Sequence, residues 1–141
     1  MLKFELVSLE GTKFSEEVFE VLLPTPDGII GVFPGHSSLV SLAKTGVVTI
    51  RRREGDNDLK LEHFAINGGV IEIADDHVRL LVDEADAEDD INQAEAQKAF
   101  ERAQQLKRDA KDQVSLDNAQ GLLDRQAVRL KVAELRRHKR R

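Results

Sequence analysis

The chain has no cysteine among its 141 residues, so a disulfide, a zinc–thiolate site or a cysteine nucleophile is impossible. It also lacks tryptophan and tyrosine and has only six phenylalanines, so its core must consist mainly of aliphatic side chains. No apolar run approaches the ~20 residues that a transmembrane helix needs, and residues 1–11 do not have the layout of a signal peptide. We therefore expect a soluble protein of a reducing compartment, which can serve a membrane only through another protein.

Charge is distributed unevenly along the chain, although the formal net charge is only −5. Residues 1–88 carry 8 Lys/Arg and 17 Asp/Glu, a net charge of −9, whereas residues 89–141 carry 13 and 9, a net charge of +4. Residues 125–141 contain 8 of these basic side chains and a single acidic one, Glu134. An acidic body with a basic end is suited to an acidic partner.

The first part of the chain has the period of two that is typical of β-strands. Leu2, Phe4 and Leu6, for example, alternate with charged residues. Short segments of this kind follow one another every 8–12 residues or so and are separated by Gly, Asn and Asp residues that favour turns. This pattern predicts an antiparallel β-sandwich of about eight to ten strands over residues 1–86.

After an acidic break at residues 83–90, the apolar period becomes that of a helix, and proline is absent. The pattern predicts two helices of about 20 residues each. The first is expected to start at Asp89 and Asp90, and the second to be capped by Ser115. Together they predict a C-terminal antiparallel two-helix hairpin over residues 89–141.

The apolar stripes of the two helices are expected to face each other. They consist of Ile91, Ala94, Ala99, Phe100, Ala103, Leu106 and Ala110 on the first helix, and of Leu116, Ala119, Leu123, Ala127, Leu130 and Ala133 on the second. A buried leucine contributes ~1.5–3 kcal/mol but an alanine much less, so we expect the hairpin to dock loosely. Two alternatives remain open: a hairpin that opens, and one that stays folded.

The segment Leu23–Val40 holds all three prolines of the chain and three of its nine glycines. Asp27-Gly28 and Pro34-Gly35 are dipeptides that favour tight turns. Glycine is costly in backbone entropy, so this composition indicates a loop that is shaped to meet a partner. The alternative is an ordinary β-hairpin with favourable turn residues.

Three glycine motifs occur in order along the predicted sandwich: G-x-x-G-x-x-P-x-H from Gly28 to His36, Gly46 before a strand, and Gly68-Gly69 at the start of the next. With the alanine-rich hairpin behind them, they make the whole chain similar to the epsilon subunit of F-type ATP synthases. The resemblance implies a rotor subunit that is not an enzyme and that couples ion flow through the c-ring to ATP synthesis. It also implies that the hairpin inhibits ATP hydrolysis when it extends along the gamma subunit into the catalytic head.

By the same resemblance, the segment Pro26–Ser38 contacts the c-ring. The contact residues that it implies are Ile29, Gly35, His36 and Ser37. Many relatives have a polar or acidic residue at the position of Ile29, so we expect an apolar ring contact there instead of a charged one. The alternative is that Ile29 packs inward.

The resemblance also implies that the second helix, when extended, presents basic residues to an acidic segment of the beta subunits. The matching residues are Arg125, Arg129, Arg136, Arg137, Lys139, Arg140 and Arg141. Exposed ion pairs contribute only ~0–1 kcal/mol each, so inhibition would need several of them together. The alternative is a solvated helix end whose cations suit the helix dipole.

Some members of the family bind ATP at the start of the hairpin through an I/L-D-x-x-R-A pattern. In this chain Ile91 matches, but Asn92 replaces the aspartate and Glu95 replaces the arginine. A carboxylate in place of a cation that faces phosphate repels the nucleotide. We therefore expect weak or absent ATP binding, and no cofactor.

Other functions fit the residues less well. The four histidines, His36, His63, His77 and His138, show no metal-ligand spacing, so no metal site is expected. The basic C-terminal end would suit nucleic acid, but the acidic body and the lack of aromatic residues there count against it. A coiled-coil adaptor would explain the helices but leave the glycine-rich segment without a role.

The resemblance implies partners and a location as well. The expected partners are the gamma subunit, the c-ring and the alpha and beta subunits, and not nucleic acid. The lack of a transit segment favours a bacterial or plastid-type origin. Of these two, we expect the cytoplasmic face of a bacterial inner or plasma membrane more than the stromal face of a thylakoid. The chain would be peripheral to that membrane, attached through the complex.

Overall fold

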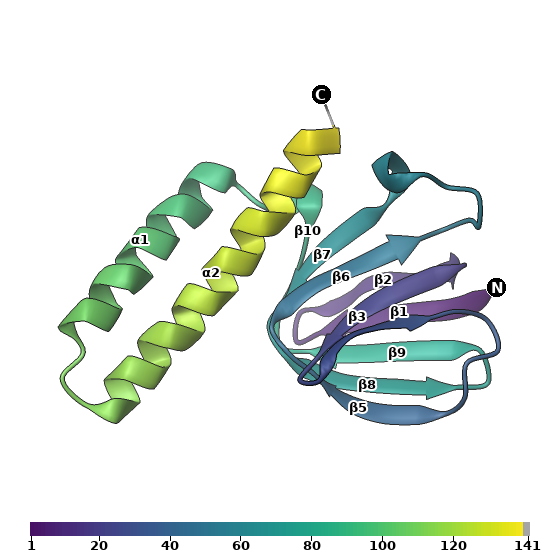
Figure 1. The fold of residues 1–141 in the computed structure, drawn as a ribbon, viewed down its shortest axis with the longest axis horizontal. Helices are drawn as coiled ribbons and strands as arrows, with labels where there is room; N and C mark the ends of the chain where they lie inside the picture. The colour runs from purple at the N-terminus through teal and green to yellow at the C-terminus, as the bar shows by residue number, and fades with distance from the viewer. Residues whose placement is uncertain (140–141) are drawn as a thin grey trace.

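The computed structural model describes residues 1–139 and has two parts, a β-sandwich followed by a helical hairpin (Figure 1). The strands are β1 (Leu2–Ser8), β2 (Gly11–Val18), β3 (Glu20–Thr25), β4 (Gly28–Val32), β5 (Leu39–Ala43), β6 (Gly46–Arg51), β7 (Glu62–Ile66), β8 (Gly69–Ala74), β9 (His77–Val82) and β10 (Ala85–Ala87), and the helices are α1 (Gln93–Asp109) and α2 (Gln113–Lys139). The predicted fold class is confirmed. The domain bounds 1–86 and 89–141 stay a prediction.

Two five-stranded sheets form the sandwich. One has the strand order β2-β1-β9-β8-β5 and the other the order β10-β7-β6-β3-β4. Neighbouring strands among the described residues are antiparallel except for β1 and β9, which run parallel with Phe4 opposite Val78. Residues 9–76, about half of the chain, separate these two strands, so no short hairpin turn dictates their relative direction.

The core between the sheets consists mainly of aliphatic side chains, as the composition predicts, and also includes Phe4, Phe14 and Phe64. Leu2, Phe4 and Leu6 of β1 are fully buried and belong to one cluster with Val48 and Ile50 of β6 in the other sheet. Because alternate residues of a strand point to opposite faces, the charged residues between them face outward. The sandwich therefore has a complete core that does not involve the hairpin.

Gly69 opens β8 with a φ of 154°, and a Cβ atom there would lie 2.1 Å from the carbonyl oxygen of Leu81 on β9. No side chain fits at that distance. The second glycine of the Gly68-Gly69 motif is thus explained by a close approach of two backbones, and not by a bound partner.

Of the two helices, α2 makes the principal contact with the sandwich (Figure 1). α2 packs on β7 and β6, and α1 packs on the opposite side of α2. Ala96 and Ala103 of α1 and Ala119 and Ala133 of α2 are buried, so alanine does line the seams of the hairpin. Three residues that were expected to face inward are instead exposed: Ala94, Leu106 and Ala127.

Both predicted helix starts are wrong by a few residues. Asp89 and Asp90 lie in a short 3-10 helix, Glu88–Asp90, and the N-cap of α1 is Asn92, whose Oδ1 accepts from the N–H of Glu95 at 3.0 Å. Ser115 lies inside α2, which starts at Gln113. The N–H of Ser115 donates to Asp112 Oδ1 at 2.7 Å, so Asp112 takes the capping position. Hydrogen bonds from the backbone and hydroxyl of Ser115 lower the pKa of Asp112, so a carboxylate and not a hydroxyl stabilises this helix end.

Within residues 1–139, no helix has both the length and the apolar composition that crossing a membrane requires. The same part of the chain holds no group of three His, Cys, Asp or Glu side chains that could bind a metal ion.

Candidate functional site

The segment that was expected to form one ring-contact loop contains strand β4, which separates its candidate residues. Ile29 lies near the start of β4, opposite Pro24, and is 72% exposed, so it does not pack inward. It lines a groove of about 480 Å³ between the sheet and the last turns of α2. Gly35, His36 and Ser37 follow the other end of β4, and five strand residues span about 17 Å.

The loop after β4 is held by the turn between β8 and β9. The N–H of Gly35, which has a φ of 86°, donates to Asp76 Oδ1 at 2.7 Å. The N–H of His36 donates to the carbonyl oxygen of Phe33 at 3.2 Å, and its ring Nδ1 lies 2.6 Å from the carbonyl oxygen of Ser37. The structure therefore brings Gly35, His36 and Ser37 together in one shaped loop, apart from Ile29.

Exposed apolar side chains gather on the edge strands β4 and β5 and on the loop that joins them. These residues, which we call the apolar rim, are Ile29, Phe33, Leu39, Val40 and Leu42. β4 and β5 each end one sheet, and they lie on the same side of the sandwich, since the N–H of Lys44 donates to the carbonyl oxygen of Pro24 at 3.0 Å. Ile29 faces the α2 side of its sheet, whereas Val40 and Leu42 face outward from the other sheet, so the rim runs around this edge of the sandwich.

The predicted acidic break contains strand β10, whose side chains alternate. Ala85 and Ala87 face the sandwich core, and the carboxylates on either side of them face α2. We call these carboxylates, Glu84, Asp86 and Glu88, the acidic strap. Three carboxylates are thus fixed on one face of the sandwich, directly beside the hairpin.

Basic side chains of α2 meet the acidic strap. Arg125 Nη1 lies 2.9 Å from Glu84 Oε2, and Arg129 Nε lies 3.5 Å from Asp86 Oδ2. The second contact is an ion pair and not a hydrogen bond, because Arg129 Nε is buried without a hydrogen-bond partner in the described part of the chain. Basic residues of the C-terminal helix therefore form ion pairs with acidic residues of the sandwich within the same chain.

The last turns of α2 bind the end of the acidic strap. Lys139 Nζ donates to Glu88 Oε1 and to the carbonyl oxygen of Leu61, both at 2.6 Å. Arg136 Nη1 donates to the carbonyl oxygen of Glu88 at 2.6 Å. The side chains of Glu88 and Lys139 are only 14% and 20% exposed, so this pair is the most buried of the three.

Four of the predicted beta-contact residues therefore lie on one stripe of α2 and face the sandwich. We call Arg125, Arg129, Arg136 and Lys139 the basic stripe. Arg137 is exposed. Arg140 and Arg141, which were predicted to act with them, lie outside the described residues.

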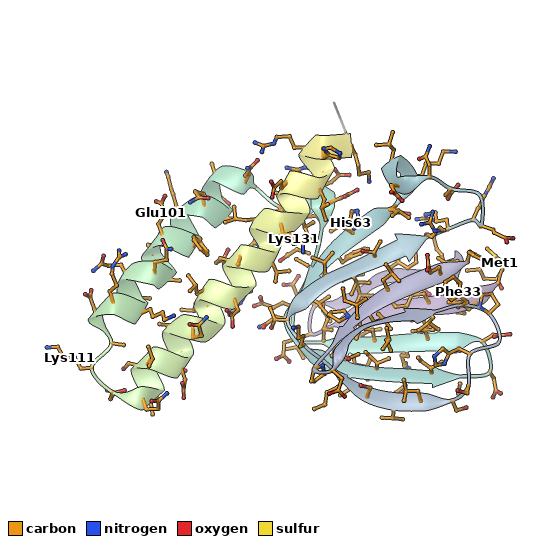
Figure 2. The ribbon with its side chains drawn as sticks, viewed as in Figure 1. Met1, Phe33, His63, Glu101, Lys111 and Lys131 are labelled. Carbon is orange, nitrogen blue, oxygen red and sulfur yellow. The ribbon has the colours of Figure 1, made fainter. Side chains whose placement is uncertain are left out.

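His63 lies on β7 in the seam between the sheet and α2 and is 8% exposed (Figure 2). Its Nδ1 is 3.2 Å from the hydroxyl oxygen of Thr49. Burial lowers the pKa of His63, while the charge of Glu88 raises it and that of Lys139 lowers it. The docked hairpin therefore favours a neutral imidazole at this position.

We expect stability to fall at acidic pH because of His63. The pKa of its imidazole is about 6.5 in the unfolded chain and lower in the folded chain. The contribution of neutral His63 to the free energy of unfolding is therefore complete above about pH 6.5, and it is lost as the pH falls through the lower, folded-state pKa. Between about pH 7.5 and 5, the Tm of the wild type should drop by roughly 3 °C more than that of His63→Gln. Circular dichroism measures this, with the exposed His138→Gln as a control that follows the wild type. Parallel curves for wild type and His63→Gln would contradict the prediction.

The chain is 33% identical over 138 residues to the ATP synthase epsilon chain of Herpetosiphon aurantiacus, which covers 98% of each protein. Residues 1–88 match the family model described as "ATP synthase, Delta/Epsilon chain, beta-sandwich domain". The chain belongs to the ATP synthase epsilon-chain family. This epsilon chain is also 33% identical over 132 residues to that of Moorella thermoacetica, covering 94% of this chain and 96% of its relative.

Solved structures share the fold of this epsilon chain. A chain in the cryo-EM structure of the Euglena gracilis mitochondrial ATP synthase, OSCP/F1/c-ring, superposes with a TM-score of 0.79 at 21% identity over 94% of this chain and 81% of that one. A chain in the central stalk/c-ring structure from Tetrahymena thermophila gives a TM-score of 0.59 at 12% identity over 92% and 94%. At these identities the comparison concerns the fold alone.

Two surfaces of this epsilon chain were missed from sequence. The acidic strap could have been found from the alternation Glu84-Ala85-Asp86-Ala87-Glu88, which is a strand pattern. The outward-facing Val40 and Leu42 of the apolar rim are separated by one residue, which places them on one face of a strand. Only the order of strands in the sheets shows that β4 and β5 are edges.

Proposed function

We propose that this epsilon chain is a non-catalytic rotor subunit in the central stalk of an F-type ATP synthase. It couples ion translocation through the c-ring to ATP synthesis and inhibits ATP hydrolysis through its C-terminal helices. The sandwich binds the gamma subunit and the c-ring, and the hairpin contacts the alpha and beta subunits. Through this complex the chain is peripheral to a membrane, on the cytoplasmic face of a bacterial cell. Membership of the epsilon-chain family supports the proposal.

The observation that carries the proposal is the small apolar seam between hairpin and sandwich. Its buried side chains are Ala65, Ile91, Ala96, Val132 and Ala133, three of which are alanine, and the partly buried Val47, Val128 and Leu130 pack against them. Each of the three alanines adds little more than one buried methyl group to the free energy of docking. Because the sandwich core contains no hairpin residue, the hairpin can leave the sandwich without disturbing that core. That independence is what a regulatory arm with two positions needs.

The sandwich offers the surfaces for the stalk. The β5 part of the apolar rim, Leu39, Val40 and Leu42, is proposed as the surface for the gamma subunit, since burying exposed aliphatic side chains drives stable association. Ile29 and the loop of Gly35, His36 and Ser37 are proposed to contact the polar loops of the c-ring from the two ends of β4. The exposure of Ile29 supports an apolar contact at that point.

The hairpin acts when it leaves the sandwich. In the extended form, the basic stripe and Arg137 are proposed to bind an acidic segment of the beta subunits. The docked form argues against nucleic acid as the target, because carboxylates of the same chain already neutralise three of these cations. The coiled-coil adaptor alternative leaves the exposed apolar rim without a partner. An ATP synthase assembled with a chain that lacks residues 89–141 tests the proposal.

MgATP is expected to bind the isolated chain weakly or not at all. Asn92 Oδ1 already accepts the N–H of Glu95, so the amide group at this position is used as a helix cap. Three further carboxylates, those of residues 88–90, precede the same helix start and repel phosphate. Isothermal titration should give a Kd above about 1 mM, the range of a binding free energy weaker than ~4 kcal/mol. The double variant Asn92→Asp/Glu95→Arg is the comparison, and micromolar binding by the wild type would overturn this expectation.

A further inference from the structure

We propose that the acidic strap keeps the hairpin docked by occupying the basic stripe, so that docking and the binding of an acidic partner exclude each other. This inference deepens the proposed function and rests on it only for the identity of the partner. The strap competes with the partner for the same cations. Glu84, Asp86 and Glu88 pair with basic residues that the extended hairpin, which we also call the arm, would present to an acidic partner.

The strap is a fixed part of the sandwich and does not travel with the arm. Asp86 is paired with Ala65 of β7 in an antiparallel ladder. Ala85, 4% exposed, is anchored in the sandwich core, and Ala87 packs against it. When α2 leaves, the three carboxylates therefore stay in place on the sandwich and remain available to take the arm back.

The geometry of the two elements matches. Alternate residues of a strand are about 6.6 Å apart, and residues four apart on a helix are about 6.0 Å apart along its axis. Glu84 and Asp86 can therefore meet Arg125 and Arg129 one to one, as the distances of 2.9 Å and 3.5 Å show. A neutral linker of the same length would leave both arginines without carboxylate partners.

The ion pairs between the acidic strap and the basic stripe are partly buried, so breaking them is costly unless other carboxylates replace those of the strap. The side chains of Lys139 and Glu88 are mostly buried, and those of Arg129 and Asp86 are about one-quarter and one-third exposed. Opening the arm in water leaves these charges without partners, whereas opening it toward other carboxylates replaces one ion pair with another. An acidic protein segment is thus the partner that can open the arm at the smallest electrostatic cost.

The test removes the strap charges in the full chain with Glu84→Gln, Asp86→Asn and Glu88→Gln. The matched control, Glu17→Gln, Glu54→Gln and Asp83→Asn, removes the same number and types of charge at exposed positions. Because the chain has no cysteine, spin labels at Thr12→Cys on β2 and Lys98→Cys on α1 report the distance between sandwich and hairpin. Circular dichroism verifies that the sandwich stays folded in every variant.

The strap variant is expected to lower the ratio of docked to open chains about tenfold, the combined effect of three pairs of modest strength, and to add a population with a longer label distance. The control variant should keep the wild-type distribution. A synthetic glutamate-rich peptide should bind the strap variant about tenfold more tightly than the wild type. Unchanged distances, an equal shift in the control, or equal peptide binding by both chains would overturn the inference.

The two proposals can fail separately. If the strap variant opens in isolation but ATP hydrolysis by the assembled enzyme is unchanged, the strap is supported and the inhibitory role of the arm is contradicted. If deletion of the hairpin raises hydrolysis while the strap variant stays docked, the inhibitory role is supported and the strap is rejected.

Discussion

An ATP synthase that contains a chain ending at residue 88 is expected to assemble normally and to hydrolyse ATP faster than the wild-type enzyme. The sandwich has its own core and carries the apolar rim, so assembly does not need the hairpin. Under the proposed function, hydrolysis rises because the deletion removes the hairpin that is proposed to block the catalytic head. If the extended form in the complex is favoured by between 0 and about 1.4 kcal/mol, half to nine-tenths of the enzymes are blocked, and the rate rises roughly two- to tenfold.

Steady-state ATP hydrolysis by the purified complex measures this effect, and proton pumping driven by ATP checks that coupling is intact. Replacing Arg129, Arg136 and Arg137 with glutamine should reproduce part of the increase. The matched control replaces Lys98, Lys107 and Arg108, which are exposed on α1, and should leave the rate unchanged. A truncated chain that assembles and leaves the hydrolysis rate at the wild-type value would remove the regulatory role.

Replacing Val40 and Leu42 with aspartate is expected to abolish incorporation of the chain into the central stalk. These side chains are 75% and 63% exposed on the same face of the edge strand β5, so the isolated chain gains little stability from them. At an interface with the gamma subunit each would contribute ~1.5–3 kcal/mol by burial. A buried carboxylate without a partner adds a further cost. We therefore expect the affinity for gamma to fall at least about 100-fold.

Co-purification with gamma and surface plasmon resonance measure the loss, and thermal unfolding shows that the fold is retained. Leu9→Asp/Val114→Asp is the matched control, because it makes the same two exchanges at residues that are 84% and 70% exposed and lie outside the rim. The control should bind gamma like the wild type. Wild-type binding by the Val40→Asp/Leu42→Asp chain would show that the rim serves another purpose.

The periodicity of short segments predicted most of the fold correctly. Leu2, Phe4 and Leu6 alternate because β1 has one buried face, and this follows from a few neighbouring residues. The change to a helical period after residue 90, with no proline beyond it, likewise predicted the hairpin. The helix starts were less predictable, since Asn92 and Asp112 compete with nearby Asp and Ser residues that can also cap a helix.

The site was predicted less well, because its residues come from distant parts of the chain. A run of carboxylates such as residues 83–90 is typical of a solvated linker, and only the pairing of β10 with β7 turns its alternate side chains toward α2. The grouping of Ile29 with Gly35–Ser37 was based on their closeness in sequence, and β4 places them apart.

Local patterns in the amino-acid order were thus enough for the type of each main element, the aliphatic nature of the core and the resemblance to a family, since these depend on interactions over a few residues. The tertiary structure alone decided which strands are edges, that β1 runs parallel to β9, and that the cations of α2 meet carboxylates of their own chain. Those features depend on contacts between segments about 40 to 75 residues apart. Such contacts are selected by the packing of the whole molecule and leave no periodic signal in the sequence.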